Sequence, residues 1–317
     1  MVEYTLYELK KGQLLGGGGR TKRPPSIFIA YSFQSEESRE FRDSIEQQIK
    51  KIPSLQNIIL KDGHVPVGTK SWSSEIRKRL KSSRLVIAEL SVLSPEVLFE
   101  CGFAWGLNKP LIPVIRSSAN SENLPKWLTD IQFGESSTEK GLSDVVNVIS
   151  TYMQEGATVR QLTNTMMPSP NEVVVISKFD SSETIDKVRQ FSSRHDLSFC
   201  SPNFIDESLC STDESITSVI SHASLIIGCL SGTKFDNLVH FAAGMVCARP
   251  TAGIARKKMR RHVLLLIPEN EHSELLIADS ARRVTHIVRV AKESELIRSL
   301  ESFVKLRKQW QTKQETQ

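Results

Sequence analysis

The fold of this chain is decided by residues 84–115, which read RLVIAELSVLSPEVLFECGFAWGLNKPLIPVI. The apolar run at 84–91 predicts a strand buried on both faces, as parallel sheets require. Ser94-Pro95-Glu96 then predicts a helix start, with a capping residue, a proline at the first helical position and an acid in the first turn. The helix continues to Lys109-Pro110, and LIPVI at 111–115 predicts the next strand. Strand, helix and strand in this order favour a parallel sheet.

The flanking sequence extends the same alternation. SIFIAYSF at 26–33 predicts a first strand, and residues 35–52 predict an amphipathic helix with apolar residues at four-residue spacing. A second strand is expected at 55–60, a helix at 71–83 and a closing helix at 141–154. We therefore expect an α/β fold of the flavodoxin or Rossmann type, in which a parallel sheet carries helices on both faces.

An internal repeat doubles this unit. Residues 75–110 align without a gap with 215–250, at a constant offset of 140, and the final proline of each block coincides. VVVISKF at 173–179 likewise parallels IFIAYSF at 27–33. We predict a flexible tail at 1–25, a first domain at 26–155, a linker at 156–172 and a second copy at 173–317. The alternative is a chance similarity between two ordinary α/β units.

Composition indicates an ordinary globular protein. The chain has 317 residues, 39% of them hydrophobic and 24% charged, with a net charge of +5 that permits a polyanionic partner without requiring one. Its five cysteines form no CxxC pair and are expected to be reduced and buried. No signal peptide or membrane-spanning run is recognisable, so we expect a cytoplasmic protein with no membrane contact. The scattered histidines have no metal-ligand spacing, and we expect no metal.

Glu100 is the most distinctive candidate for chemistry. It is the sole charge between Glu96 and Lys109, in an otherwise apolar helix. A carboxyl group in an apolar setting near the carboxyl edge of a parallel sheet favours a raised pKa or a nucleophilic role. The alternative is an exposed glutamate whose stem lies along the helix.

The other candidate site residues are expected at the same carboxyl edge of the sheet. The backbone near Ser32 is expected to bind a phosphate, and Tyr31 or Trp72 to stack on a base, although a core aromatic is the commoner outcome. Phe33 follows the first strand, and Asp62-Gly63 brings a carboxylate to the sheet edge or forms a simple turn. His64 is expected to be a surface residue.

A resemblance to a known family is carried by Ala88–Val114, AELSVLSPEVLFECGFAWGLNKPLIPV. It resembles the nucleoside 2-deoxyribosyltransferase-like proteins, with their motif A-D-L-T-x-x-N-P-N-V-x-x-E-x-G-x-A-x-x-x-x-K-P. The segments IFIAYSFQSEESREF and IRKRLKSSRLVIAELS resemble the related TIR domains. The resemblance implies that Glu100 attacks the anomeric carbon of a nucleotide, nucleoside or NAD and releases the base, with no cofactor. By analogy it also implies an effector in bacterial antiphage defence.

The chain departs from the family motif at three positions. Glu89 replaces the usual aspartate, and Ser94 and Glu96 replace the two asparagines of N-P-N. Glu89 and Glu96 are the acids left to handle the leaving base.

The second copy has lost the key acid, since His240 aligns with Glu100 and Cys229 with Glu89. It is expected to be a pseudo-enzyme that completes the site or senses a ligand. The basic run at 256–261 is either a solvated loop or a nucleic-acid contact. The rival interpretation is a non-catalytic nucleotide-binding or scaffold protein. A homo-oligomer and a defence-system partner are both compatible with the sequence.

Overall fold

The computed structural model describes residues 24–64, 72–107, 109–116, 134–135, 137–155, 172–176, 182–200, 220, 223–230, 236–248, 262–267 and 288–315. Nearly all of the expected tail and linker, and all of the basic run at 256–261, lie outside these residues. In the described part of the chain, no helix combines the length and the apolar character that a membrane span needs.

The first sheet has five parallel strands in the order β2-β1-β3-β4-β5. They are β1 (Ser26–Ala30), β2 (Ile59–Asp62), β3 (Leu85–Glu89), β4 (Leu111–Ile115) and β5 (Gly134–Glu135). Every residue of β1 and β3 is buried, because helices cover both faces of the sheet. This is the flavodoxin-type order, which places a switch point between β1 and β3.

The second sheet repeats this order as β7-β6-β8-β9-β10, again with parallel strands. Its strands are β6 (Glu172–Ile176), β7 (Ser198–Cys200), β8 (Leu225–Cys229), β9 (His262–Ile267) and β10 (Val288–Lys292). The register repeats as well: Ile27 pairs with Leu85 in the first sheet, and Val173 pairs with Leu225 in the second. The expected α/β fold class with two flavodoxin-like units is confirmed.

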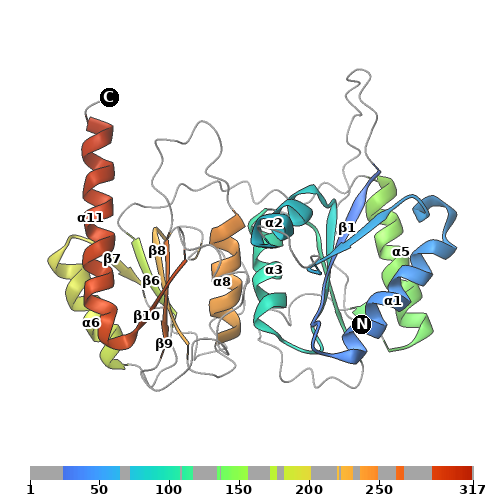
Figure 1. Cartoon of the computed structure of the whole chain (residues 1–317), viewed down its shortest axis with the longest axis horizontal. Coiled ribbons are helices and arrows are strands. Elements are labelled where there is room, and N and C mark those ends of the chain that lie inside the picture. Colours follow the sequence, from blue (N-terminus) through green and yellow to red (C-terminus); the bar gives the residue numbers. More distant parts are fainter. Residues whose placement is uncertain are drawn as a thin grey trace, which may run out of the picture.

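The outer face of the first sheet is covered by α1 (Glu36–Lys51) and α5 (Glu139–Glu155). The α1 helix begins where the Ser35 hydroxyl accepts a hydrogen bond from the Ser38 amide at 3.2 Å. Its buried residues Phe41, Ile45 and Ile49 recur at every fourth position, so one face of the helix packs on the sheet. The outer face of the second sheet is covered by α6 (Ser182–Arg194) and α11 (Leu296–Glu315) (Figure 1). The exposed 3-10 turn η4 (Glu293–Glu295) connects β10 to α11.

The strand expected at 55–60 begins later than predicted, at Ile59. A short 3-10 turn, η1 (Pro53–Leu55), occupies the start of that segment. The Leu55 amide donates to the Ile52 carbonyl and the Ile58 amide to the Leu55 carbonyl, each at 2.9 Å. These turn bonds compete with sheet pairing, and the prolyl ring favours the turn. The strand lies at the sheet edge, where Ile59 is 45% exposed.

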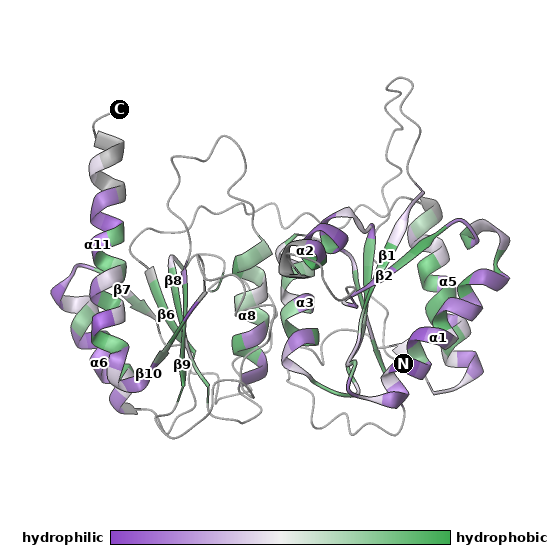
Figure 2. Cartoon of the chain, viewed as in Figure 1, coloured by the Kyte–Doolittle hydropathy of each residue, from purple (hydrophilic) through white to green (hydrophobic). Residues whose placement is uncertain are grey.

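The inner faces of the two sheets face each other across α3 (Pro95–Gly106) and α8 (Asp236–Ala248), which lie side by side in the middle of the molecule, with α2 (Trp72–Ser82) beside α3 (Figure 1). One continuous hydrophobic core includes residues of both sheets and both helices. Figure 2 shows the strands of both sheets as predominantly hydrophobic. The two α/β units therefore share a core.

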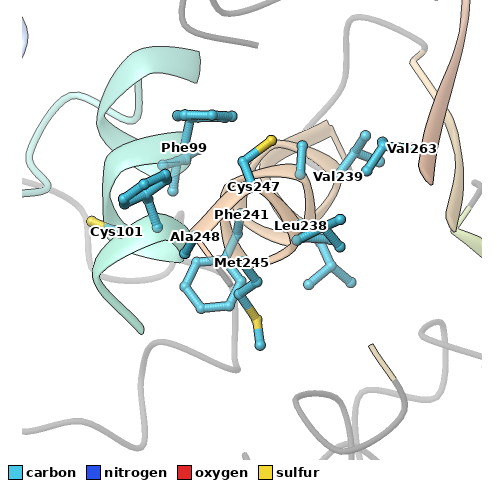
Figure 3. Close-up of a cluster of buried hydrophobic side chains, with 14 of the residues drawn as sticks. Phe99, Cys101, Leu238, Val239, Phe241, Met245, Cys247, Ala248 and Val263 are labelled. Atoms are coloured by element: carbon cyan, nitrogen blue, oxygen red, sulfur yellow. The ribbon is translucent and has the colours of Figure 1, made fainter. Parts of the chain in front are cut away.

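Glycines allow the closest approach of α3 and α8. A Cβ atom at Gly102 would lie 1.9 Å from the Phe241 carbonyl oxygen, and one at Gly244 would lie 2.0 Å from the Phe99 carbonyl oxygen. The ring of Trp105 meets that of Phe241 edge-on, with centroids 6.1 Å apart. The side chains around this contact are apolar (Figure 3). At this distance between the two backbones, no residue larger than glycine fits at position 102 or 244. The two helices therefore fit each other specifically.

Candidate active site at the carboxyl edge of the first sheet

Glu100 lies in the middle of α3 and is only 2% exposed. The loop after β2 covers its carboxyl group: a Cβ atom at Gly63 would lie 2.8 Å from Glu100 Oε1 and 3.1 Å from the ring of Phe33. Glu100 therefore sits beneath the carboxyl ends of β1 and β2, where a parallel sheet presents its ligands. The alternative of an exposed helix glutamate is wrong, because residues 97–104 of α3 are all buried.

The environment of Glu100 favours its neutral form. Burial raises the pKa of this carboxyl group well above its usual value, and the negative charges of Glu96 and Asp62 raise it further. Glu96 lies one helical turn before Glu100, in the first turn of α3. Such a shift is typical of groups that act in catalysis, although buried structural carboxyls show it too.

Aromatic rings lie beside the loop that covers Glu100. The rings of Tyr31 and Phe33 lie 4.5 Å apart between centroids, and the Phe33 and His64 rings lie 6.1 Å apart. Tyr31 is 7% exposed, and its burial followed by the charge of Asp62 raises its pKa to about 12. Tyr31 and Phe33 thus form an aromatic wall beside the loop after β2, and stacking of a base on it stays a prediction. His64 itself is exposed.

Asp62 is held in place by the loop and two arginines. Its Oδ1 accepts a hydrogen bond from the His64 amide at 2.9 Å, and its Oδ2 lies 3.5 Å from Arg42 Nε. Arg79 Nη1 lies 3.8 Å from Oδ1 and donates to the carbonyl oxygens of Asp62 and His64, at 3.0 and 2.7 Å. Asp62 therefore fixes the loop that covers Glu100, in addition to contributing charge beside it.

Glu89 is fully buried at the end of β3, and both of its carboxylate oxygens accept hydrogen bonds. The Ser38 hydroxyl donates to Oε2 at 2.6 Å, and the Ser91 amide donates to Oε1 at 3.0 Å. These bonds join the first turns of α1 to the loop after β3. They give Glu89 a positioning role, with no free oxygen aimed at a leaving base in this arrangement.

The remaining candidates are distributed around the same edge. Ser94 caps α3, its hydroxyl accepting from the Val97 amide at 3.3 Å. Ser32 is buried in the turn between β1 and α1, where its carbonyl accepts from the Ser35 amide at 3.2 Å. Trp72 is the first residue of α2, but its side chain lies outside the described part of the chain. The base-stacking role of Trp72 thus stays a prediction.

Arg116 is a site residue that the sequence analysis missed. It follows β4, and its amide donates to the Ser91 hydroxyl at 2.9 Å. Its Nη1 lies 3.2 Å from Glu37 in the first turn of α1, whereas its buried Nη2 has no hydrogen-bond partner among the described residues. A buried guanidinium nitrogen beside a helix N-terminus favours an anionic ligand. The sequence could have indicated Arg116 through its position, because it directly follows the predicted strand LIPVI at 111–115.

The second copy places different residues at the equivalent positions. His240 lies in α8 and is 2% exposed, and Cys229 ends β8. No described group of three or more histidine, cysteine or acidic side chains is arranged to hold a metal ion. Within the described residues, the buried glutamate at this position of the central helix is thus found in the first copy alone.

Comparisons with known proteins add little to this geometry. No family model matches the chain, and no curated protein matches it. Among solved structures, a probable two-component system response regulator/GGDEF domain protein is 13% identical over 90% of this chain and 99% of its own, with a TM-score of 0.28. A second structure of the same description is 12% identical with the same coverage and TM-score. Similarity at this level carries no argument about function.

Proposed function

We propose that the first α/β unit is an N-glycosidase that cleaves the base–sugar bond of a nucleotide, nucleoside or NAD, with Glu100 as the reactive carboxyl group. The observation that carries the proposal is the buried position of Glu100 beneath the carboxyl edge of a parallel sheet, against Gly63, which also contacts the aromatic wall of Phe33 and Tyr31. The sequence motif around Glu100 supports the same chemistry through its resemblance to the deoxyribosyltransferase-like proteins.

Cleavage of an N-glycosidic bond develops positive charge at the anomeric carbon. A carboxylate beneath that carbon stabilises the charge or captures it covalently. Because Glu100 is 2% exposed, the loop that contains Gly63 must move aside to admit a substrate. When a sugar displaces Gly63, the carboxyl group of Glu100 faces the anomeric carbon of that sugar.

The raised pKa of Glu100 makes the pH profile informative. A nucleophile must be ionised, so its rate rises with pH until Glu100 has lost its proton. A proton donor to the leaving base must be neutral, so its rate falls over the same range. The family resemblance favours the nucleophile, and the rising profile is the one we expect.

Arg116 supports a phosphorylated substrate. Its buried Nη2 and the start of α1 lie on the same edge of the sheet as Glu100. A guanidinium group binds phosphate oxygens strongly and adds to the favourable field at a helix N-terminus. On this basis we place nucleotides and NAD ahead of unphosphorylated nucleosides.

The proposal is tested by incubating the protein with NAD, nucleosides and nucleoside monophosphates and separating the released bases by chromatography. Wild type is expected to release a base, Glu100→Gln to lose this activity, and Glu301→Gln, an exposed acid on α11, to retain it. Nicotinamide release without an acceptor indicates hydrolysis, whereas a requirement for an acceptor base indicates transfer. Equal release by wild type and Glu100→Gln excludes the proposed role.

A specific observation favours a second candidate, a non-catalytic nucleotide-binding or scaffold protein. Glu100 is closed off from solvent, and its helix packs against α8, in which His240 takes the equivalent position. If this candidate is correct, neither wild type nor Glu100→Gln releases a base, and nucleotides bind both without turnover. A setting in antiphage defence, or assembly with a second copy of the chain, belongs to the proposal by analogy alone.

A further inference from the structure

Residues 62–64 lie directly over Glu100, and we call them the covering segment. A Cβ atom at Gly63, the middle residue of this segment, would lie 2.8 Å from Glu100 Oε1. Glu100 itself is only 2% exposed. A ligand that approaches the carboxyl group from this side therefore meets the covering segment first and requires it to move.

Arg79, in α2, holds the covering segment at both of its ends. Its Nη1 donates to the carbonyl oxygen of Asp62 at 3.0 Å and to that of His64 at 2.7 Å. One nitrogen of the guanidinium group thus joins the two residues that flank Gly63. Hydrogen bonds from a charged donor are roughly twice as strong as those between neutral groups. The side chain of Arg79 is 22% exposed, so water and salt screen these bonds only in part.

Glu75 holds the guanidinium group of Arg79 through a different nitrogen. Its Oε1 accepts a hydrogen bond from Arg79 Nε at 3.4 Å. The two residues are four positions apart on α2, the spacing at which side chains on a helix meet. Because Glu75 uses Nε, Nη1 remains available for the two carbonyl oxygens of the covering segment.

The covering segment is also braced internally. The His64 amide donates to Asp62 Oδ1 at 2.9 Å, across the intervening glycine. Residues joined in this way move together, so loss of both bonds to Arg79 frees the segment as a unit. A further contact, between Asp62 Oδ2 and Arg42 Nε, is longer at 3.5 Å and involves no backbone atom.

We propose that Arg79 is a positioning residue that holds the covering segment closed over Glu100 and so controls access to that carboxyl group. It acts through Gly63 and needs no contact of its own with Glu100. When its two bonds break, the segment opens locally while the sheet and the core stay folded. The control of substrate entry rests on the proposed function, whereas the opening of the segment does not.

The opening is measured with the variant Glu100→Cys, in which a thiol replaces the covered carboxyl group. Iodoacetamide is added, and tandem mass spectrometry follows the modification of position 100 over time. Cys101 lies in the same peptide and is fully buried, so its modification reports loss of the whole fold. A covered thiol reacts only while it is exposed, so the rate at position 100 follows the population of the open state.

Arg79→Gln, introduced into the Glu100→Cys protein, is expected to raise the rate at position 100 at least about tenfold, because each hydrogen bond to a charged group is worth about a factor of ten or more. The rate at Cys101 is expected to stay unchanged. The matched control is Lys78→Gln, which removes a neighbouring charge that also lies near Glu75, at 3.6 Å. Because Lys78 is 77% exposed and makes no hydrogen bond to the covering segment in the described part of the chain, this control is expected to leave both rates unchanged.

Equal rates at position 100 in Arg79→Gln and Lys78→Gln overturn the proposal. So does a rate that is already as fast with Arg79 in place as in urea. If Arg79→Gln exposes Cys101 as well, Arg79→Lys replaces it and is compared with the same control, since lysine keeps the charge but lacks the planar fork. The labelling needs no substrate, so a failure of the clamp is distinguishable from a failure of the proposed function, which base release tests separately.

Discussion

Replacement of Gly102 by alanine probes the contact that joins the two α/β units. In an isolated helix this change stabilises by up to about 1 kcal/mol, because glycine is the poorer helix former. In the protein the new Cβ atom would lie 1.9 Å from the Phe241 carbonyl oxygen, and a normal contact requires at least 3.0 Å. The obstacle is backbone, which no rotamer change moves. The helices must separate by more than 1 Å.

The cost of that separation exceeds the gain in helix propensity. Overpacking a core costs about 1–3 kcal/mol and occasionally more, and here the strain spreads through the core that both sheets share. We expect Gly102→Ala to lower the free energy of unfolding by about 3 kcal/mol. At roughly 2 °C per kcal/mol for a chain of this size, the melting temperature falls by about 6 °C.

Urea unfolding and thermal melting, both followed by circular dichroism, measure the effect. Asn147→Ala, on the exposed face of α5, is the control and is expected to stay within about 0.5 kcal/mol of wild type. Gly244→Ala should behave like Gly102→Ala, and the double variant should lose less than the sum, because one displacement relieves both clashes. A Gly102→Ala protein as stable as wild type, or more stable, refutes the close packing of α3 against α8.

Three further predictions concern buried polar groups. Because burial raises the folded-state pKa of Glu100, the folded protein holds a proton that the unfolded chain releases above about pH 4.5, and each pH unit in this window costs wild type about 1.4 kcal/mol. Glu100→Gln lacks this proton, so urea unfolding at pH 5 and pH 8 should show its free energy of unfolding rising relative to that of wild type. A difference between the two proteins that is the same at both pH values contradicts a buried, neutral carboxyl group. Ser38→Ala removes the 2.6 Å hydrogen bond to Glu89 and should lower the unfolding free energy by about 1–3 kcal/mol in the same assay, and an unchanged midpoint argues against the tether. Burial raises the pKa of Cys229 to about 12 and that of Cys101 still higher, so mass spectrometry after iodoacetamide should find both unmodified in the folded protein and alkylated in urea.

Much of the fold was predictable from local patterns. The strand at 111–115 and the capped helix that begins at Pro95 appear as expected, because a buried strand and a capped start have strong local signals. The strand expected at 55–60 was placed too early, because LQNIIL is equally compatible with a turn, and the sheet decides which residues pair. The short β5 strand, Gly134–Glu135, carries no pattern of its own and exists through its pairing with β4.

The candidate site was predictable only in part. Glu100 was identifiable as a charge in an apolar helix, and its burial bears out the reasoning about its surroundings. The tethering of Glu89 by Ser38 was not predictable, since the two residues are far apart in sequence and serine is a common residue near helix starts. Arg116 was missed for the same reason: its place beside Glu37 depends on how α1 and β4 meet across the sheet.

The sequence by itself determined that this chain contains two similar α/β units, because strand and helix periodicity and an ungapped alignment are local properties. It also determined that only the first unit has a glutamate at this position of the central helix. It also marked α3 as apolar all round, which requires burial on every side. Only the tertiary structure decided that α8 of the second copy packs against α3, at a short distance that Gly102 and Gly244 permit. The periodicity of a helix indicates that one of its faces is buried. Which element packs against that face depends on the fit of two surfaces, and those surfaces exist only once both copies have folded.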